Sequence, residues 1–133
     1  MKINIIQSPN YSKKNHNKRN IKYIVIHYTG MQSERACIKR LVDKKSKVST
    51  HYLINRLGNV TKMVDESNIA WHAGRSKWKN SINLNYQSIG IELVNKGHQF
   101  GYENFSVKQI SRLILLCKEL VKKYKIKKTN ILG

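Results

Sequence analysis

Two short apolar runs, each containing one ionisable residue, constrain this chain more than any other feature. Residues 23–28 read YIVIHY and residues 88–94 read SIGIELV. Short runs rich in β-branched residues are typical of strands buried within a sheet. We therefore expect His27 and Glu92 to lie in neighbouring buried strands. A buried glutamate must be paired, face a metal or carry out acid–base chemistry, whereas a lone strand histidine is more often a core residue.

Turn and capping residues predict the elements between these strands. Ser33 can cap a helix that runs through about Val42. Residues 48–55 and 60–64 predict a hairpin whose turn contains Gly58. The segment 65–87 has no clear period, and a long aperiodic loop in a small domain usually carries function.

The C-terminal part of the chain predicts one long amphipathic helix and a final strand. Ser106 and Gln109 have the spacing of a capping box, and residues 129–132 begin another strand. The apolar residues at helical spacing are Ile110, Leu113, Ile114, Cys117, Leu120, Val121 and Tyr124. We expect the helix to pack on the sheet through Ile110, Leu113, Ile114, Cys117 and Tyr124. The element order β-α-β-β-β-α-β predicts an α/β fold with a single mixed β-sheet flanked by helices.

A chain of 133 residues and 15.5 kDa has room for one hydrophobic core, so residues 21–133 are interpreted as one domain. Residues 1–20 are polar and basic, and they are predicted to form an irregular N-terminal basic arm on the surface. They contain no apolar segment of the kind found in secretory leaders, which favours a cytoplasmic localisation, with the cell envelope or secretion as the alternative. We expect a monomer without a membrane-spanning segment.

The formal net charge is +19, from 26 Lys and Arg against 7 Asp and Glu. This excess favours anionic partners, but lysine outnumbers arginine and Asn and Ile are abundant, as in proteins from AT-rich genomes. Nucleic acid is the weaker interpretation because no aromatic-interleaved basic strand or recognition helix is present. Cys37 and Cys117 lie on apolar helix faces and are interpreted as buried thiols.

Five runs of the sequence together resemble a known enzyme family. They are YIVIHYTG, VSTHYLINRLGNV, IAWHAGRSKW, INLNYQSIGIELVN and TNILG. In this order and spacing they resemble zinc-dependent N-acetylmuramoyl-L-alanine amidases of the type 2 fold, and most nearly the bacterial AmpD and AmiD branch. Animal peptidoglycan-recognition proteins are more distant relatives. The resemblance covers about residues 6 to 133.

The resemblance implies a role for six residues. His27 matches the first zinc ligand, and Glu92 matches the catalytic glutamate that acts through the zinc-bound water. The implied substrate-binding residues are Lys47, Trp71, Asn83 and Leu93, with Asn83 in place of an arginine of AmpD. Core packing is the competing interpretation for Trp71 and Leu93. The implied reaction cleaves the amide bond between N-acetylmuramic acid and L-alanine in peptidoglycan or muropeptides.

The sequence departs from the family pattern in its metal ligands. Among the family's ligand positions only His27 is present, and the pattern places the second histidine and an aspartate beyond Gly133. His51 matches a structural histidine of the family, and His72 lies near the expected pocket without a spacing that marks it as a ligand. We therefore expect zinc to be weakly bound or absent and activity to be doubtful. A non-catalytic peptidoglycan-binding module is the alternative function.

Overall fold

The computed structural model describes residues 1–13, 19–73, 84–97 and 103–133. These residues form a six-stranded sheet in the order β1-β5-β4-β7-β3-β8 and a small sheet in which β2 pairs with β6. The strands are β1 (Ile3–Ile5), β2 (Tyr11–Ser12), β3 (Tyr23–Tyr28), β4 (Tyr52–Ile54), β5 (Val60–Lys62), β6 (Ile69–Ala70), β7 (Ser88–Leu93) and β8 (Ile131–Leu132). The large sheet contains parallel and antiparallel pairs, so the predicted α/β fold with a mixed sheet is confirmed.

The two runs that dominate the sequence form the centre of this sheet. Strands β3 and β7 are parallel neighbours, and His27 is the register partner of Glu92. Side chains alternate between the two faces of a strand, so in-register partners on parallel strands point to the same side. The prediction that His27 and Glu92 lie on adjacent strands is therefore confirmed, and both side chains lie on one face.

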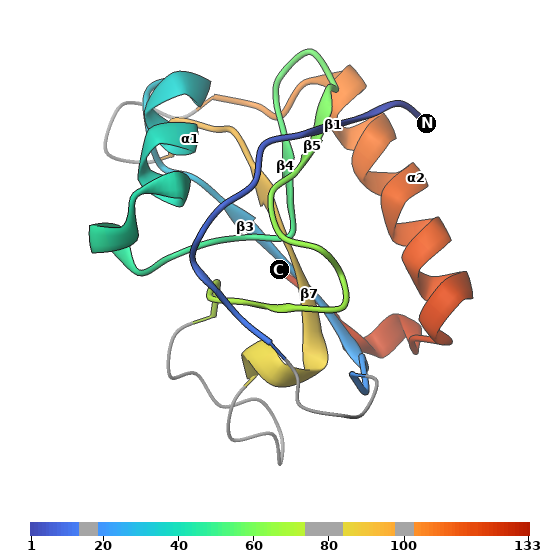
Figure 1. The fold of residues 1–133 in the computed structure, drawn as a ribbon. Helices are drawn as coiled ribbons and strands as arrows, with labels where there is room; N and C mark the ends of the chain where they lie inside the picture. The colour runs from blue at the N-terminus through green and yellow to red at the C-terminus, as the bar shows by residue number, and fades with distance from the viewer. Residues whose placement is uncertain (14–18, 74–83, 98–102) are drawn as a thin grey trace.

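Two helices cover opposite faces of the sheet (Figure 1). Helix α1 (Glu34–Val42) begins after Ser33, whose side chain accepts a hydrogen bond from the Ala36 N–H, as predicted. Helix α1 packs against a small cluster that includes Leu53 and Met63. Helix α2 (Val107–Tyr124) packs on the other face, where it meets the main core. Short 3-10 helices complete the described chain: η1 (Lys44–Ser46), η2 (Leu84–Gln87) and η4 (Lys128–Asn130).

The N-terminus of α2 follows the predicted capping box only in part. The Ser106 hydroxyl accepts from the Gln109 N–H at 3.0 Å, as a capping residue should. The Gln109 side chain does not return to Ser106. It is fully buried and donates to the carbonyls of Ile54 and Val94, both at 3.0 Å. This amide thereby ties α2 to the ends of β4 and β7.

The face of α2 that meets the sheet is turned slightly from the predicted one. Leu116 and Leu120 are each 2% exposed at its centre, and Leu113, Cys117 and Tyr124 pack at its edges, the last three as predicted. Ile114 remains 50% exposed, so its predicted packing on the sheet is wrong. The apolar stripe along α2 is wider than the area that contacts the sheet, so Ile114, at the margin of the stripe, stays exposed to solvent.

The prediction of an irregular surface arm over residues 1–20 is also wrong for residues 1–13, the part of this segment that the structure describes before position 19. Strand β1 pairs in parallel with β5, and β2 pairs with β6. Ser8 and Asn10 are buried, and the Asn10 amide donates to the carbonyls of Asp43 and Val48. Backbone pairing and buried side-chain hydrogen bonds fix this polar segment without an apolar run.

The predicted hairpin is confirmed, with shorter strands than expected. Strands β4 and β5 are antiparallel, and Gly58 in the turn has a φ of +82° that favours glycine. Within the part of the chain that the structure describes, no helix is long and apolar enough to cross a membrane.

Candidate active site

A pocket of about 200 Å³ opens beside the carboxyl ends of β3 and β7. Its lining includes Tyr28, Thr29, Arg40, Trp71, His72 and Glu92. In α/β folds, ligands commonly bind at the carboxyl ends of parallel strands, because side chains from neighbouring strands converge there. The position and the lining make this pocket the candidate active site.

Glu92 is the acidic group of the pocket. Burial raises the pKa of its carboxyl to about 7, and the nearby Arg40 guanidinium opposes that rise. No described residue donates a hydrogen bond to the carboxylate. A carboxyl of this pKa exchanges its proton near neutral pH, which is the requirement for a general base or acid under ordinary conditions.

His27 lies next to Glu92 across the strand pair, and its ring contacts a second histidine. The His27 Nε2 atom is 3.0 Å from the His72 Nδ1 atom. Burial lowers the pKa of both imidazoles, that of His72 well below the ordinary value of 6.5. Both rings are therefore neutral at pH 7, and each has one nitrogen with a lone pair.

A buried polar cluster extends from this pair toward the amino ends of the same strands. The Arg19 guanidinium donates to the carbonyls of Glu66, Asn85 and Ser88 at 2.6, 3.0 and 2.6 Å. His51 accepts from the Gly90 N–H and lies 2.8 Å from the Asn68 carbonyl, to which its Nε2–H donates. Burial lowers the pKa of His51 to about 4, so this ring is a neutral structural residue, as the resemblance implied.

The four predicted substrate-binding residues have different outcomes. Trp71 lines the pocket, and its indole N–H donates to the Ser12 hydroxyl at 2.9 Å. Lys47 is exposed, with a φ of +55° after η1, and does not line the pocket. Leu93 is 3% exposed within the main core on the α2 face, the core packing that was the competing interpretation for it. Asn83 lies outside the described residues.

Sequence reasoning missed two groups of the pocket. Arg40, in the last turn of α1, brings a positive charge to the same pocket as Glu92. His72 was assigned no role, although it contacts His27. The sequence placed His72 in the run IAWHAGRSKW near the expected pocket, but no spacing marked it as a ligand. Arg40 gave none, because a basic residue near a helix C-terminus is also what the helix dipole favours.

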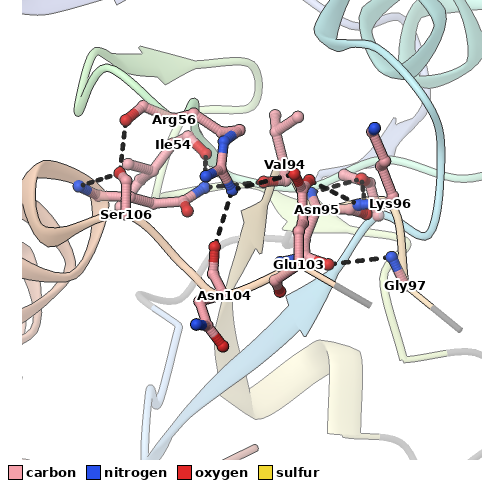
Figure 2. A network of polar contacts seen from close by, with 11 residues as sticks. Ile54, Arg56, Val94, Asn95, Lys96, Gly97, Glu103, Asn104 and Ser106 are labelled. Atoms are coloured by element: carbon pink, nitrogen blue, oxygen red, sulfur yellow. Dashed lines mark hydrogen bonds and ion pairs between the residues drawn. The ribbon is translucent and has the colours of Figure 1, made fainter. Parts of the chain in front are cut away.

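A polar network fixes the rim of the pocket against the start of α2 (Figure 2). The Thr29 hydroxyl bonds both the N–H and the carbonyl of Asn95, each at 3.2 Å. The Asn95 side-chain amide donates to the Glu103 carbonyl and accepts from the Gly97 N–H (Figure 2). The Glu103 carboxylate lies 3.5 Å from the Arg56 guanidinium. The strand ends that carry the pocket are therefore held by side chains as well as by the sheet.

Comparisons with known proteins agree with this fold. A family model described as N-acetylmuramoyl-L-alanine amidase matches residues 17–133. The chain belongs to this amidase family. The match includes β3, α1, the β4–β5 hairpin, β7 and α2, so the amidase segment contains every described residue that lines the pocket.

Two curated amidases illustrate the relationship. AmiD of Escherichia coli is 38% identical over 125 aligned positions, covering 85% of this chain and 44% of AmiD. The 1,6-anhydro-N-acetylmuramyl-L-alanine amidase AmpD of Haemophilus influenzae is 31% identical over 148 aligned positions, covering 96% of this chain and 77% of AmpD. This amidase chain thus spans less than half the length of AmiD and about three quarters of that AmpD.

Solved amidase structures share the fold. The complex of E. coli AmiD with anhydro-N-acetylmuramic acid-L-Ala-D-γ-Glu-L-Lys matches with a TM-score of 0.78 at 32% identity, covering 92% of this chain and 55% of the AmiD chain. AmpDh3 of Pseudomonas aeruginosa matches with a TM-score of 0.78 at 28% identity, covering 96% of this chain and 56% of its own. The mixed sheet with its two helices is therefore the type 2 amidase fold.

The residues described here do not form a complete site for zinc, the metal that the family resemblance implies. Catalytic zinc takes three protein ligands and keeps one position open. Over residues 1–13, 19–73, 84–97 and 103–133, no group of three His, Cys, Asp or Glu side chains could hold a metal ion. His27 and His72 place two nitrogens 3.0 Å apart, a hydrogen-bond distance, and no third ligand joins them.

Proposed function

We propose that this chain hydrolyses the amide bond between N-acetylmuramic acid and L-alanine in peptidoglycan or muropeptides. The observation that carries the proposal is the Glu92 carboxyl, partly buried in the pocket with its pKa raised to about 7, in a chain that belongs to the amidase family. AmiD, with which the chain shares 32% identity in the structural match, was solved with an anhydro-muramyl tripeptide. We assign a substrate of that class to the pocket.

Glu92 is assigned the proton transfers of the reaction. As a carboxylate it accepts the proton of the water that attacks the amide carbonyl. As the resulting acid it passes that proton to the leaving amine of L-alanine. A pKa near 7 allows both steps at neutral pH, because neither the acid nor the base form is strongly favoured.

Arg40 and Trp71 are assigned to substrate binding. The peptide of a γ-linked glutamate carries a free carboxylate, and a guanidinium at the pocket can hold it by charge-assisted hydrogen bonds. Trp71 offers an aromatic surface to the sugar in the same pocket. We also propose that Lys47 and Asn83 contact the substrate. We further propose that the protein is cytoplasmic and monomeric.

His27 is the residue that we assign to zinc, as the family resemblance implies. When bound, the metal would polarise the amide carbonyl and acidify water. Because the described residues do not supply three ligands, the steps assigned above rest on Glu92 and the pocket alone.

The experiment is cleavage of anhydro-N-acetylmuramyl-L-Ala-D-γ-Glu-L-Lys, followed by chromatography of the released tripeptide. We expect Glu92→Gln to keep the fold and lower turnover by about 10²–10⁴-fold, the usual contribution of an acid–base group. Glu119→Gln, on the exposed side of α2, is the matched control and should leave turnover unchanged.

Two results would contradict the proposal. Full turnover of Glu92→Gln would show that another group transfers the proton. Binding of the muramyl tripeptide by the unmodified chain without any cleavage would instead support the non-catalytic peptidoglycan-binding module.

A further inference from the structure

His72 is held on three sides in a way that no role assigned above explains. Its backbone N–H and that of Ala73 both donate to the Asn85 side-chain oxygen, at 3.2 and 2.9 Å. Its ring Nε2 lies 2.9 Å from the Ser88 hydroxyl, and its ring Nδ1 lies 3.0 Å from His27 Nε2. The ring thus bridges the start of β7 and the end of β3.

The sheet beneath the ring is shaped for it. A Cβ atom at Gly90 would lie 2.5 Å from His72 Cγ and 2.6 Å from Cδ2, far inside van der Waals contact. Gly90 does not have a positive φ, so backbone conformation does not explain the glycine. Glycine in a strand interior often marks a close approach, and here the approaching group is the His72 imidazole.

The hydrogen bonds of the neighbouring His51 show that this region fixes the tautomer of its imidazole rings. The His51 ring has a donor partner in the Gly90 N–H and an acceptor partner in the Asn68 carbonyl. Both of its nitrogens are therefore occupied and its tautomer is fixed. His72 is also occupied at both nitrogens, but its partners are the Ser88 hydroxyl and His27.

The contact with His72 determines which atom of His27 remains available. With Nε2 of His27 engaged, only Nδ1 can meet a ligand or substrate. Nδ1 carries a lone pair when the ring proton sits on Nε2, which then donates to His72 Nδ1. A neutral His72 accepting at Nδ1 carries its own proton on Nε2 and donates it to the Ser88 hydroxyl. The three residues then form a chain of hydrogen bonds in one direction.

We propose that His72 is a positioning residue that fixes His27 in the Nε2–H tautomer and leaves the His27 Nδ1 lone pair for the reaction. The use of that lone pair rests on the proposed function, whereas the tautomer itself does not. Histidines that bind ligands through one nitrogen commonly donate the other N–H to such a partner, which sets the orientation of the ring.

The first test is nuclear magnetic resonance of the unmodified chain with ¹⁵N-labelled histidine at pH 8. We expect a scalar coupling across the hydrogen bond between His27 Nε2 and His72 Nδ1, with the proton on His27 Nε2. A proton on His72 Nδ1, or no coupling between these nitrogens, would overturn the proposal. This measurement requires neither substrate nor metal, so an inactive chain would count against the proposed function and leave this result intact.

Variants supply the second test. His72→Leu removes the acceptor and Gly90→Ala displaces the ring without changing its chemistry. Both should abolish the coupling and lower turnover by about 10–100-fold, as loss of such a partner usually does. His72→Asn restores an acceptor near the Nδ1 position and should recover protection of the His27 Nε2 proton from solvent exchange. Equal proton exchange in His72→Leu and His72→Asn would show that the ring only fills space.

Ser88→Ala is the matched control. It removes the far partner of His72 and keeps the contact with His27, so the coupling should persist. If Ser88→Ala abolishes the coupling as fully as His72→Leu does, the orientation of His27 comes from the packing of β7 and not from His72.

Discussion

The two faces of strands β3 and β7 solve the problem of burial in different ways. On the α2 face, Ile24, Ile89 and Ile91 are fully buried against Leu116 and Leu120. On the other face, alternate residues of the same strands include His27, Ser88 and Glu92. The apolar face is stabilised by removal of surface from water, which any well-packed side chain provides. The polar face requires specific partners, because an unsatisfied buried group is costly.

Because side chains alternate between the two faces of each strand, one sheet can place its stabilising core on one face and its reactive groups on the other. A one-residue shift in the pairing of β3 with β7 would exchange the two sets of side chains. The apolar face therefore fixes the register that brings His27 beside Glu92.

Among substitutions on the polar face, loss of Arg19 should lower the free energy of unfolding most. Arg19→Met would leave the carbonyls of Glu66, Asn85 and Ser88 without their donor, at about 1–3 kcal/mol for each buried acceptor. We expect the free energy of unfolding in urea to fall by about 3–5 kcal/mol. The exposed Arg35→Met is the control and should change it by less than about 0.5 kcal/mol. A small effect at Arg19 would mean that water replaces the guanidinium.

Truncation on the apolar face should lower stability and spare the chemistry. Leu120→Ala removes a side chain that is 2% exposed, and we expect a loss of about 2–5 kcal/mol in the urea experiment. Turnover per folded molecule should stay within about twofold, because no residue of α2 lines the pocket. A large loss of turnover in the folded variant would show that the two faces are coupled.

The polar face should set the pH dependence of stability. The pKa of Glu92 is about 7 in the folded chain against an ordinary 4.5, so folding disfavours its ionisation and stability falls as pH rises between these values. Glu92→Gln should remove this fall and be more stable than the unmodified chain at pH 9 by up to about 3 kcal/mol. The pKa of His51 is lowered to about 4, so stability should also fall as pH decreases below 6.5 in both proteins. Urea unfolding at pH 5, 7 and 9 would measure both slopes. An alkaline slope that persists in Glu92→Gln would assign it to another group.

The smallest effect is expected at the margin of α2. Ile114 is 50% exposed, so Ile114→Ala should lower the free energy of unfolding by less than about 1 kcal/mol. The same urea experiment with Leu116→Ala provides the buried comparison. Equal losses at the two positions would mean that Ile114 is covered in solution.

The elements that the sequence predicted share strong local patterns. Residues 23–28 and 88–94 are apolar enough to be recognised as strands without any partner, and Ser33 and Ser106 mark their helices by capping chemistry. Parallel neighbours then place His27 beside Glu92. The position of these two residues could therefore be inferred before the structure was known.

The features that the sequence did not predict depend on contacts between distant segments. Strand β1 is three residues long and is defined by its pairing with β5. Arg19 is buried because the Glu66 carbonyl and two carbonyls at or just before the start of β7 surround it, and arginine gives no such signal on its own. The place of His72 depends on Gly90 beneath it and on Asn85 beside it. Hydrophobic periodicity describes single elements and contains no information about contacts between segments that are distant in the sequence.

The position of β3 between β7 and β8 has a consequence for how the chain acquires its fold during synthesis. β3 is complete at Tyr28, but its two parallel neighbours are Ser88–Leu93 and Ile131–Leu132. A ribosome must therefore extend the chain by about a hundred residues beyond β3 before both edges of that strand can pair. Pairings so distant in sequence close slowly and leave apolar strand edges open while they wait. We expect the nascent chain to depend on chaperones until β8 emerges.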